Sequence, residues 1–584
     1  MKAKISRHLV LISSVVIIFA GFLLLMLPSL TSGLGERCIL NQCGIFFTNI
    51  FRARDDLWHM SLAQVAFDTY PFRMPVFYGE ALRGYHFLYS YILMLVTKTG
   101  LSVLSGYYLA LPIVWFIIYT SFTVAISRAL FSDKRAVPIF LFFSYFSSNL
   151  TFVLSLKNTG SFWNDIGWFS NQPAEYMINP TLALSILLLQ AIIYVLLRVR
   201  SSIILTIILT VLTFLLWGAK FYGGVIGISF IWIFLATKTY NKHLSLKSLL
   251  SILFATLLSS TIAVLFFYNP FVGTKTGGIF SLEPFKTIHP IIEDPGLFQI
   301  LKLARLRYKL YEHPYIFAPI LLVIEIFSLA LYIFIAFGTR MLSVALLFSK
   351  IHKSTLNIAI FASAIFSIIF AALFTQKGGD WFNTVQFLGY GQFLLQIALW
   401  LFVISLLKFH DKRTNALIVS VLVLTLAGSL NPVVEYGKDH LFSSGSQIHK
   451  LFQPKVYVSG AELEALSYLS KLPSGVTYTF PFTPIYDERP IKQLWKTNDT
   501  ALVAALGKQQ LYEANLQQLD ITGIDHKKRT QLLKNVLTTN IKSLPVRYLY
   551  LYKQHPDYKK FVTRTSPSAV SLFENGEVLI LKKM

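Results

Sequence analysis

The chain contains a series of apolar segments long enough to cross a lipid bilayer, and these segments restrict the folds open to it more than any other feature. The first runs from about Leu9 to Leu30, behind Lys2, Lys4 and Arg7. A signal peptide has a shorter apolar core of roughly 7 to 15 residues, whereas about 20 apolar residues cross the hydrocarbon. We therefore expect an uncleaved transmembrane helix with its N-terminus in the cytoplasm.

The composition agrees with a membrane protein. Of the 584 residues, 54% are hydrophobic and only 14% are charged, with a formal net charge of +24. A basic excess can indicate a nucleic-acid-binding protein, but here Lys and Arg are scattered between apolar segments. Cytoplasmic loops that collect basic residues, and contact with anionic lipids, explain such an excess. We expect a mainly α, polytopic protein of the plasma membrane that contacts membrane lipids and no nucleic acid.

The apolar runs predict eleven transmembrane helices in all. Short basic loops follow every second helix, which places these loops in the cytoplasm and the C-terminus outside. The expected spans are residues 9–30, 103–126, 136–156, 179–197, 202–217, 222–237, 248–268, 315–337, 356–374, 387–407 and 414–430. The basic loops contain Arg128, Lys134 and Arg135; Arg198 and Arg200; Lys238, Lys242 and Lys247; Arg340, Lys350 and Lys353; and Lys408, Lys412 and Arg413.

One further apolar segment is too short for a comfortable crossing. Residues 85–97 read YHFLYSYILMLVT, and a span there would put the later basic loops on the wrong side of the membrane. A helix lying in the outer interface, with its tyrosines at headgroup depth, keeps the alternation.

Two regions outside the membrane are long enough to carry a site. The first outer loop covers residues 31–102 of a membrane domain that we place at 1–430, and residues 431–584 follow as a small extracytoplasmic α/β domain. In this tail AELEALSYLSKL has helical periodicity, VRYLYLYK indicates a strand, and Asn575-Gly576 indicates a hairpin. The two cysteines, Cys38 and Cys43, both lie in the first outer loop, where a structural disulfide is favoured over a metal site.

The first outer loop is unusually rich in ionisable residues. Its segment NIFRARDDLWHMSLAQ places Asp55 and His59 on one face of a helix and turns Asp56 to the side. Helix capping explains one aspartate but not the density of charge, because ionisable groups packed beside a bilayer are costly. The charged and imidazole groups nearby are Arg52, Arg54, Arg73, Glu80, Arg83 and His86.

These residue types suit sugar transfer from a lipid donor. A carboxylate at the membrane boundary can serve as general base toward a hydroxyl or amine acceptor. Arginines beside it can hold a phosphate leaving group. A sugar on a long isoprenoid phosphate presents its reactive carbon at that depth.

The order of motifs resembles the GT-C superfamily of membrane glycosyltransferases, which includes protein mannosyltransferases and oligosaccharyltransferases. The resemblance rests on RDDLWH in the first outer loop, PVFYGEALRGYHFLY before the next helices, NPTLALSILLL opening a span, and the soluble tail. It implies an inverting enzyme with a polyprenyl-phosphate sugar as donor and a glycan, lipid or protein as acceptor. Asp55 matches the family's catalytic base, Asp56 and His59 would orient it, and the phosphate partners would be Arg52, Arg54, Arg73 and Lys220.

Further substrate-binding candidates lie in the other outer loops. Asp165 and Glu175 in the second loop could orient the acceptor or help hold a metal, although solvated carboxylates are an equal explanation. A clean D-x-D motif is missing, so we expect no obligatory metal, and a divalent cation (Mg²⁺ or Mn²⁺) stays the alternative. The remaining candidates are Glu80, His86, Arg305, Asp380, Asn383 and Gln386.

Three of these candidates have ordinary structural explanations. Lys220 could snorkel to lipid headgroups instead of holding an anion. Arg305 lies with Lys302 and Lys309 along one face of a basic amphipathic helix, with Arg307 to its side, and generic lipid contact is favoured there. Gln386 could make interhelical hydrogen bonds.

Other functions stay open at this point. A transporter or flippase for lipid-linked saccharides would place charges at mid-membrane and show related halves. A non-catalytic envelope assembly or sensor protein would tolerate changes at Asp55. A ligase that joins preassembled polysaccharide to an acceptor would share the outer-face site. The sequence has no Walker A, GxGxxG, GxSxG or HExxH motif, so a nucleotide as energy source is not expected.

Overall fold

The structure is a computed structural model of the chain. It describes residues 2–48, 50–163, 173–269, 280–294, 297–348, 354–376, 382–407, 409, 411–441, 454–534, 544–565 and 568–584.

Long apolar helices dominate the described residues, as the sequence predicts. Ten of them are long and apolar enough to cross a membrane, or eleven if one bent pair is a single span, which confirms the polytopic, mainly α fold. The bent pair is Ala136–Phe146 with Thr151–Thr159, whose axes differ by 44°. The ten are His8–Thr31, Val103–Leu130, Pro180–Arg198, Ser202–Ala219, Phe221–Tyr240, Leu246–Tyr268, Pro314–Phe348, Thr355–Leu373, Asn383–Leu406 and Lys412–Leu430.

The segment that we expected to lie in the interface forms the helix α3, Leu88–Thr97. Its ten residues are too few to cross the hydrocarbon. The structure therefore agrees with the prediction that this segment does not cross the membrane.

Arg340 corrects the sequence-based assignment of one basic loop. The helix α14 (Pro314–Phe337) continues beyond Gly338 as a 3₁₀ helix, η6 (Gly338–Phe348). Arg340 on η6 is only 1% exposed, and it donates hydrogen bonds to the carbonyl oxygens of Ser147 and Ser148. Those carbonyls lie at the break between α6 (Ala136–Phe146) and α7 (Thr151–Thr159), where the helical hydrogen bonds are interrupted. Arg340 therefore satisfies a helix break and does not mark a solvated loop.

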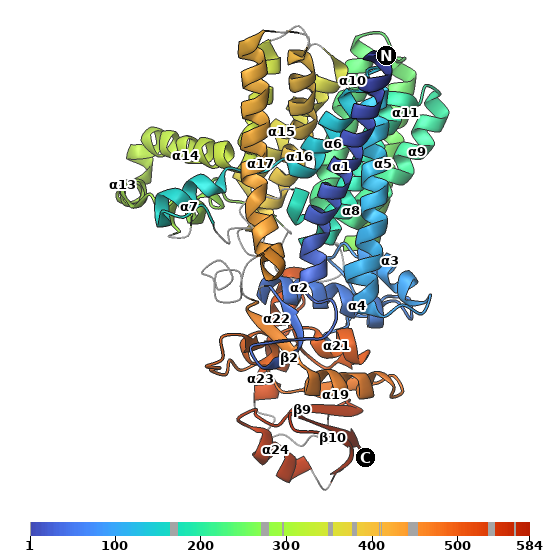
Figure 1. Cartoon of the computed structure of the whole chain (residues 1–584). Coiled ribbons are helices and arrows are strands. Elements are labelled where there is room, and N and C mark those ends of the chain that lie inside the picture. The colour runs from blue at the N-terminus through green and yellow to red at the C-terminus, as the bar shows by residue number, and fades with distance from the viewer. Residues whose placement is uncertain are drawn as a thin grey trace. The chain divides into compact units, whose positions relative to one another are not determined.

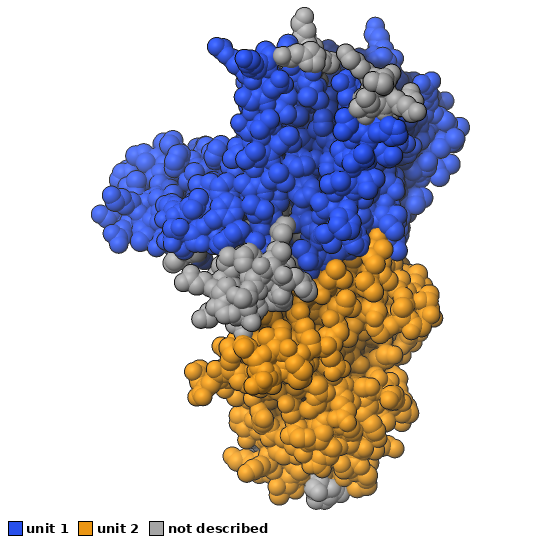
Figure 2. Space-filling view, in the orientation of Figure 1, with its two compact units in different colours: residues 1–28, 114–263, 278–452 blue, residues 29–113, 264–277, 453–584 orange. Residues whose placement is uncertain are grey.

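The chain forms two units by its internal contacts, and Figure 2 colours them separately. Unit 1 consists of Met1–Pro28, Val114–Ala263 and Gly278–Phe452, and it holds most of the long helices. Unit 2 consists of Ser29–Ile113, Val264–Gly277 and Gln453–Met584. The first loop therefore belongs to the same unit as the C-terminal tail, whereas we expected the tail alone, from residue 431, to form a domain.

Unit 1 is built around the helix α16 (Phe382–Leu406), which packs against α15 (Thr355–Leu373), α6 and η6. The helices α8 (Pro180–Arg198), α9 (Ser202–Ala219), α10 (Phe221–Tyr240) and α11 (Leu246–Ala263) pack on one another in the same unit. At Gly223 in α10, a Cβ atom would overlap Ser185 and approach the hydroxyl of Tyr390 to 2.8 Å. Glycine there allows α10 to lie directly against α8, where Tyr390 donates to Ser185.

The remaining helices of unit 1 surround this centre. The helices α7, α13 (Leu301–Tyr311) and α14 lie together (Figure 1), with α12 (Ile288–Glu293) packed between α13 and α14. The helices α1 (Lys2–Thr31) and α5 (Leu111–Leu130) begin in one unit and end in the other. The helix α17 (Lys412–Leu441) belongs to unit 1 and extends past residue 431, where we expected the tail to begin. The strands β3 (Phe280–Leu282) and β4 (Phe374–Gln376) pair antiparallel.

Two sheets form the centre of unit 2. The first has the order β1-β2-β5-β7, and the second has the order β10-β11-β9-β6-β8. Their strands are β1 (Arg37–Ile39), β2 (Gln42–Phe47), β5 (Val456–Ser459), β6 (Val476–Thr479), β7 (Lys492–Gln493), β8 (Gln510–Leu511), β9 (Tyr548–Tyr552), β10 (Ala569–Glu574) and β11 (Val578–Lys583). The short helices of the tail are α19 (Gly460–Ser470), α20 (Leu494–Thr497), α21 (Leu502–Gly507), α22 (Leu516–Thr522), α23 (Lys527–Lys534) and α24 (Tyr558–Thr565).

Backbone pairing explains why the first loop and the tail form one unit. The strand β2 of the first loop pairs antiparallel with β5 of the tail, from Gly44 with Ser459 to Phe47 with Val456. A second contact joins Phe77 to Glu513 in an isolated antiparallel bridge. An edge strand leaves its N–H and C=O groups unpaired, and the tail satisfies those of β2.

The local predictions for these regions are confirmed. The helix α19 and the strand β9 fall on the predicted segments, and β10 and β11 form the hairpin around Asn575-Gly576. Cys38 and Cys43 form a disulfide across the β1–β2 turn.

Glu462 on α19 is a fully buried carboxyl group in unit 2. Ser459 caps the helix by accepting from the backbone N–H of Glu462 at 3.2 Å. The hydroxyl of Tyr552 donates to Glu462 Oε1 at 2.6 Å. Burial raises the pKa of Glu462 to about 8, and nearby Glu577 acts in the same direction. The group is therefore protonated at neutral pH.

The raised pKa of Glu462 predicts a pH-dependent stability. Stability from the protonated carboxyl is complete below the unfolded-state pKa of 4.5 and is lost as the pH rises to about 8. The loss is on the order of 3 kcal/mol between about pH 5 and pH 8. Thermal unfolding of the full-length protein at both pH values should show this loss in the wild type and a smaller one in Glu462→Gln. Glu488→Gln, at an exposed tail position, is the control and should behave like the wild type.

Candidate functional site

The charged segment of the first loop forms the helix α2, Ile50–Ser61. The helix begins five residues before Asp55, and no acidic residue lies in its first turn. The structure therefore excludes capping as the role of Asp55 and Asp56. Asp55 is exposed to solvent, whereas the neighbouring Asp56 is fully buried.

Three side chains hold the buried Asp56. Tyr107 donates a hydrogen bond to Oδ1 at 2.7 Å, and Tyr108 donates one to Oδ2 at 2.5 Å. Arg52, one turn earlier on α2, forms an ion pair with Oδ2 at 3.4 Å. Burial raises the pKa of Asp56 above its ordinary value, while Arg52 and the two tyrosines act in the opposite direction.

Gly33 makes room for this arrangement. Its φ of +79° lies in the left-handed region, and a Cβ atom there would overlap the ring of Tyr108. Arg52 and Asp56 thus fix α2 against the rest of unit 2. The predicted role of Arg52 as a phosphate partner stays a prediction, and its side chain is buried against Asp56.

His59 lies on the buried side of α2, with 4% of its surface exposed. Its Nδ1 lies 3.0 Å from the hydroxyl of Ser90, and its Nε2 lies 3.4 Å from the hydroxyl of Tyr85. Asp55 and His59 were predicted to share one face of the helix. In the structure the carboxyl group of Asp55 is exposed, whereas the imidazole of His59 is buried. His59 fixes α2 against α3.

The other candidates of the first loop have mixed surroundings. Arg54 donates to Gln517 of the tail and lies over the ring of Phe51. Arg73 is exposed. Glu80 pairs with Arg83 at 3.4 Å. His86 stacks on Tyr85, with ring centroids 4.3 Å apart.

In unit 1, the predicted residues Lys220, Asn383 and Gln386 form one hydrogen-bonded group with Asn179, which the sequence analysis missed. Lys220 lies between α9 and α10, and its Nζ donates to Asn179 Oδ1 at 3.3 Å and to Thr181 at 3.0 Å. The amide of Asn179 also donates to Gln386 at 3.3 Å, and Gln386 donates to Asn383 at 3.3 Å. Asn179 is the N-cap residue of α8. The Asn-Pro pair at the start of this span is the sequence feature that could have identified Asn179.

Lys220 does not snorkel to the surface, because only 5% of it is exposed. Its ammonium lies 5.9 Å from the ring centre of Tyr222. Tyr222 in turn donates to Gln376 at 2.8 Å. A largely buried cationic group that donates to hydroxyl and amide groups is suited to binding an anion.

On the basic helix α13, the exposure of the basic side chains follows the predicted helix face. Lys302, Arg305 and Lys309 are exposed, whereas Arg307 is buried. Arg307 pairs with Glu293 and lies 4.0 Å from Glu325. Arg305 is therefore available to lipids and phosphates.

The acidic candidates outside α2 are less informative. Glu175 in the 3₁₀ helix η4 (Pro173–Ile178) is 7% exposed, and it interacts electrostatically with Arg340. This buried position contradicts the description of Glu175 as a solvated carboxylate. Asp165 and Asp380 lie outside the described residues. In the part of the chain that the structure describes, no three His, Cys, Asp or Glu side chains are grouped to hold a metal ion.

Comparison with known proteins gives structural likeness only. No family model matches the sequence, and no curated protein matches it. The chain is similar to the archaeal oligosaccharyltransferase AglB from Archaeoglobus fulgidus, solved with an inhibitory peptide and a dolichol-phosphate, at 12% identity over 99% of this chain and 74% of AglB, with a TM-score of 0.47. A second structure of the A. fulgidus oligosaccharyltransferase, with Zn and sulfate, has 11% identity over 96% and 72% of the two chains and a TM-score of 0.45.

ArnT from Cupriavidus metallidurans in the apo state is similar over 100% of this chain and 99% of ArnT, at 9% identity and a TM-score of 0.48. All three TM-scores lie below 0.5, so the functional assignment is built on the chain's own residues.

Proposed function

We propose that the chain is an inverting membrane glycosyltransferase. It moves a sugar from a polyprenyl-phosphate donor to a glycan, lipid or protein acceptor on the outer face of the plasma membrane. Asp55 is the general base, and no metal ion is required for the step.

The observation that carries the proposal is the contrast between two neighbouring carboxyl groups on α2. Asp55 is exposed, and Asp56 beside it is buried and held by Arg52, Tyr107 and Tyr108. An incoming acceptor cannot reach a buried carboxyl group to give it a proton, whereas it can reach an exposed one on a fixed helix. Rigid support of this kind is what a catalytic group needs to keep its geometry.

The chemistry assigned to Asp55 is balanced without a cofactor. The carboxylate takes the proton from the acceptor hydroxyl or amine as that atom attacks the anomeric carbon. The bond between the anomeric carbon and the phosphate oxygen breaks, and polyprenyl phosphate leaves with the electron pair. Attack from the face opposite the phosphate inverts the anomeric configuration.

The phosphate end of the donor requires cationic and hydrogen-bonding groups. We assign this role to the exposed Arg73, which lies in the same unit as Asp55. Lys220, Asn383 and Gln386 stay sequence-based candidates for substrate binding, and in unit 1 the largely buried Lys220 donates to Asn179 and Thr181.

A transfer assay separates this function from transport. The full-length protein is reconstituted in liposomes with a radiolabelled sugar on polyprenyl phosphate and with extracted envelope glycans and lipids as acceptors. We expect label in the acceptor fraction and an equal amount of free polyprenyl phosphate. Movement of intact donor across the bilayer, with no cleavage, would assign the chain to the flippases instead.

A further inference from the structure

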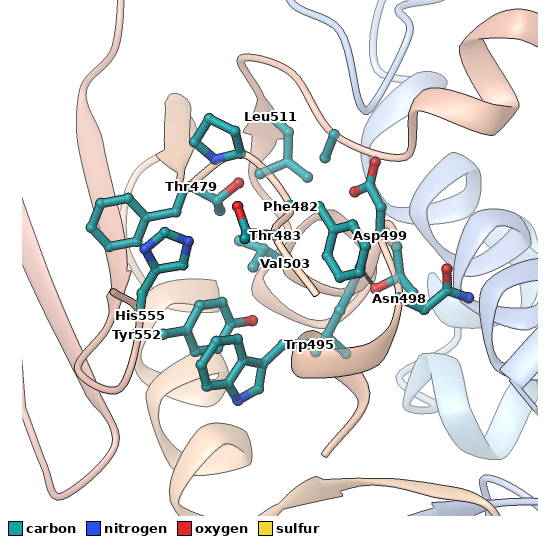
Figure 3. Close-up of a pocket in the computed structure, with 15 residues that line it drawn as sticks. Thr479, Phe482, Thr483, Trp495, Asn498, Asp499, Val503, Leu511, Tyr552 and His555 are labelled. Carbon is teal, nitrogen blue, oxygen red and sulfur yellow. Dashed lines mark hydrogen bonds between the residues drawn. The ribbon is translucent and has the colours of Figure 1, made fainter. Parts of the chain in front are cut away.

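A pocket in the C-terminal tail is lined by residues that have no part in the proposed catalytic step. The described residues that line it lie between Thr479 and His555 (Figure 3). The space among them, with the solvent at the open mouth included, is about 500 Å³. Two stacked aromatic pairs form part of its wall. Trp495 stacks on Tyr552 with ring centroids 4.2 Å apart, and Phe480 stacks on His555 at the same distance.

Polar groups lie around the same opening. Figure 3 shows Thr479, Thr483 and Asn498 there, together with the ring of Phe482. Within the described residues, the side chains of Thr479, Thr483 and Asn498 make no hydrogen bond. The pocket therefore offers hydroxyl and amide groups to a ligand beside aromatic surface.

The charge of the lining disfavours an anionic ligand. Among the residues that the structure describes, no lysine or arginine lines the pocket. Burial lowers the pKa of His555, so its ring is neutral at pH 7. The acidic residue of the lining, Asp499, accepts backbone hydrogen bonds from Asn515 and Leu516 at 2.8 Å each. A phosphate or carboxylate would meet no compensating charge here.

We propose that this pocket binds a neutral saccharide unit of the acceptor glycan. A sugar ring has an apolar C–H face that packs on aromatic side chains and a rim of hydroxyl groups that pair with threonine and asparagine. An apolar peptide side chain would cover the same rings but would leave Thr479, Thr483 and Asn498 unpaired on burial. The assignment of this saccharide to the acceptor rests on the proposed function.

The pocket is linked to the helix that carries Asp55. Leu502 and Val503 of α21 line the pocket, and α21 also packs against α2. Asp499 of the pocket interacts electrostatically with Arg54, the residue before Asp55. An acceptor glycan in this pocket would thus be held by the same unit that carries the general base.

Saturation-transfer NMR on full-length Asp55→Asn in nanodiscs tests the pocket without catalysis. The probes are neutral trisaccharides of glucose, galactose, mannose and N-acetylglucosamine, with inorganic phosphate as the anionic comparison. We expect saturable binding of at least one trisaccharide and none of phosphate. Phe482→Ala or Asn498→Ala, each introduced into the Asp55→Asn protein, should weaken this binding about 10-fold, because each removes one contact surface or one hydrogen-bonding group.

The control is Tyr486→Ala, which removes an 84% exposed ring from the same segment outside the pocket and should leave binding unchanged. No saturable binding by any trisaccharide, or binding that Phe482→Ala and Asn498→Ala leave intact, would overturn the proposal. Since binding is read without transfer, a pocket that binds saccharide in a chain that shows no transfer activity would refute the proposed function alone.

Discussion

Replacement of Asp55 by asparagine is expected to lower the rate of sugar transfer by about 10²- to 10⁴-fold, the usual contribution of a general base. Asparagine keeps the size of the side chain but cannot take up the proton of the acceptor. Because Asp55 is exposed on α2, the variant should fold and insert like the wild type. The measurement is single-turnover transfer from a labelled polyprenyl-phosphate sugar in proteoliposomes.

The matched control for this variant is Asp68→Asn. Asp68 is an exposed aspartate in the same loop and the same unit, so its replacement removes the same charge near the membrane. We expect transfer at the wild-type rate. Equal transfer rates in Asp55→Asn and Asp68→Asn would show that Asp55 is not the general base.

Replacement of Asp56 by alanine is expected to destabilise unit 2 by about 3–5 kcal/mol, since it removes the carboxylate that pairs with a buried guanidinium group. Arg52 would be left without its carboxylate, and the hydroxyl groups of Tyr107 and Tyr108 would lose their acceptor. Thermal unfolding followed by the fluorescence of Trp58, which is buried in the same helix, measures the effect.

The double variant Arg52→Met with Asp56→Leu provides the control. It removes both charges and keeps most of the buried volume, so stability should largely return. A stability of Asp56→Ala equal to the wild type would show that this pair does not hold α2. Because we assign Asp56 a positioning role, Asp56→Asn should lower kcat without changing the KM for the donor.

The sequence predicts the membrane part of this fold well, because hydrocarbon imposes a simple rule of length and apolarity. The spans and the short helix α3 follow from that rule alone. The hairpin at Asn575-Gly576 was likewise predictable, since it depends on local turn chemistry.

The merging of the first loop with the tail was not predictable in this way. The pairing of β2 with β5 joins Phe47 to Val456 across more than half of the chain, and no local pattern marks such a partner. The same holds for Arg340, which a charge count places in a solvated loop but which satisfies carbonyl groups at a helix break.

The sequence predicted which residue types form the candidate site, and it predicted the role of each residue less well. Helical spacing placed Asp55 and His59 on one face, but burial depends on what packs against α2, and Tyr85 and Ser90 cover the imidazole. Asp56 gained its role from Tyr107 and Tyr108, which lie about fifty residues away. Side-chain partners at such a separation are set by tertiary packing.

The most direct test of the central claim is an electron cryomicroscopy structure of the Asp55→Asn protein in nanodiscs with a polyprenyl-phosphate sugar. We expect density for the sugar with its anomeric carbon beside residue 55. Donor density at a site from which the side chain of residue 55 cannot reach an acceptor at the anomeric carbon would contradict the assignment of Asp55 as the base.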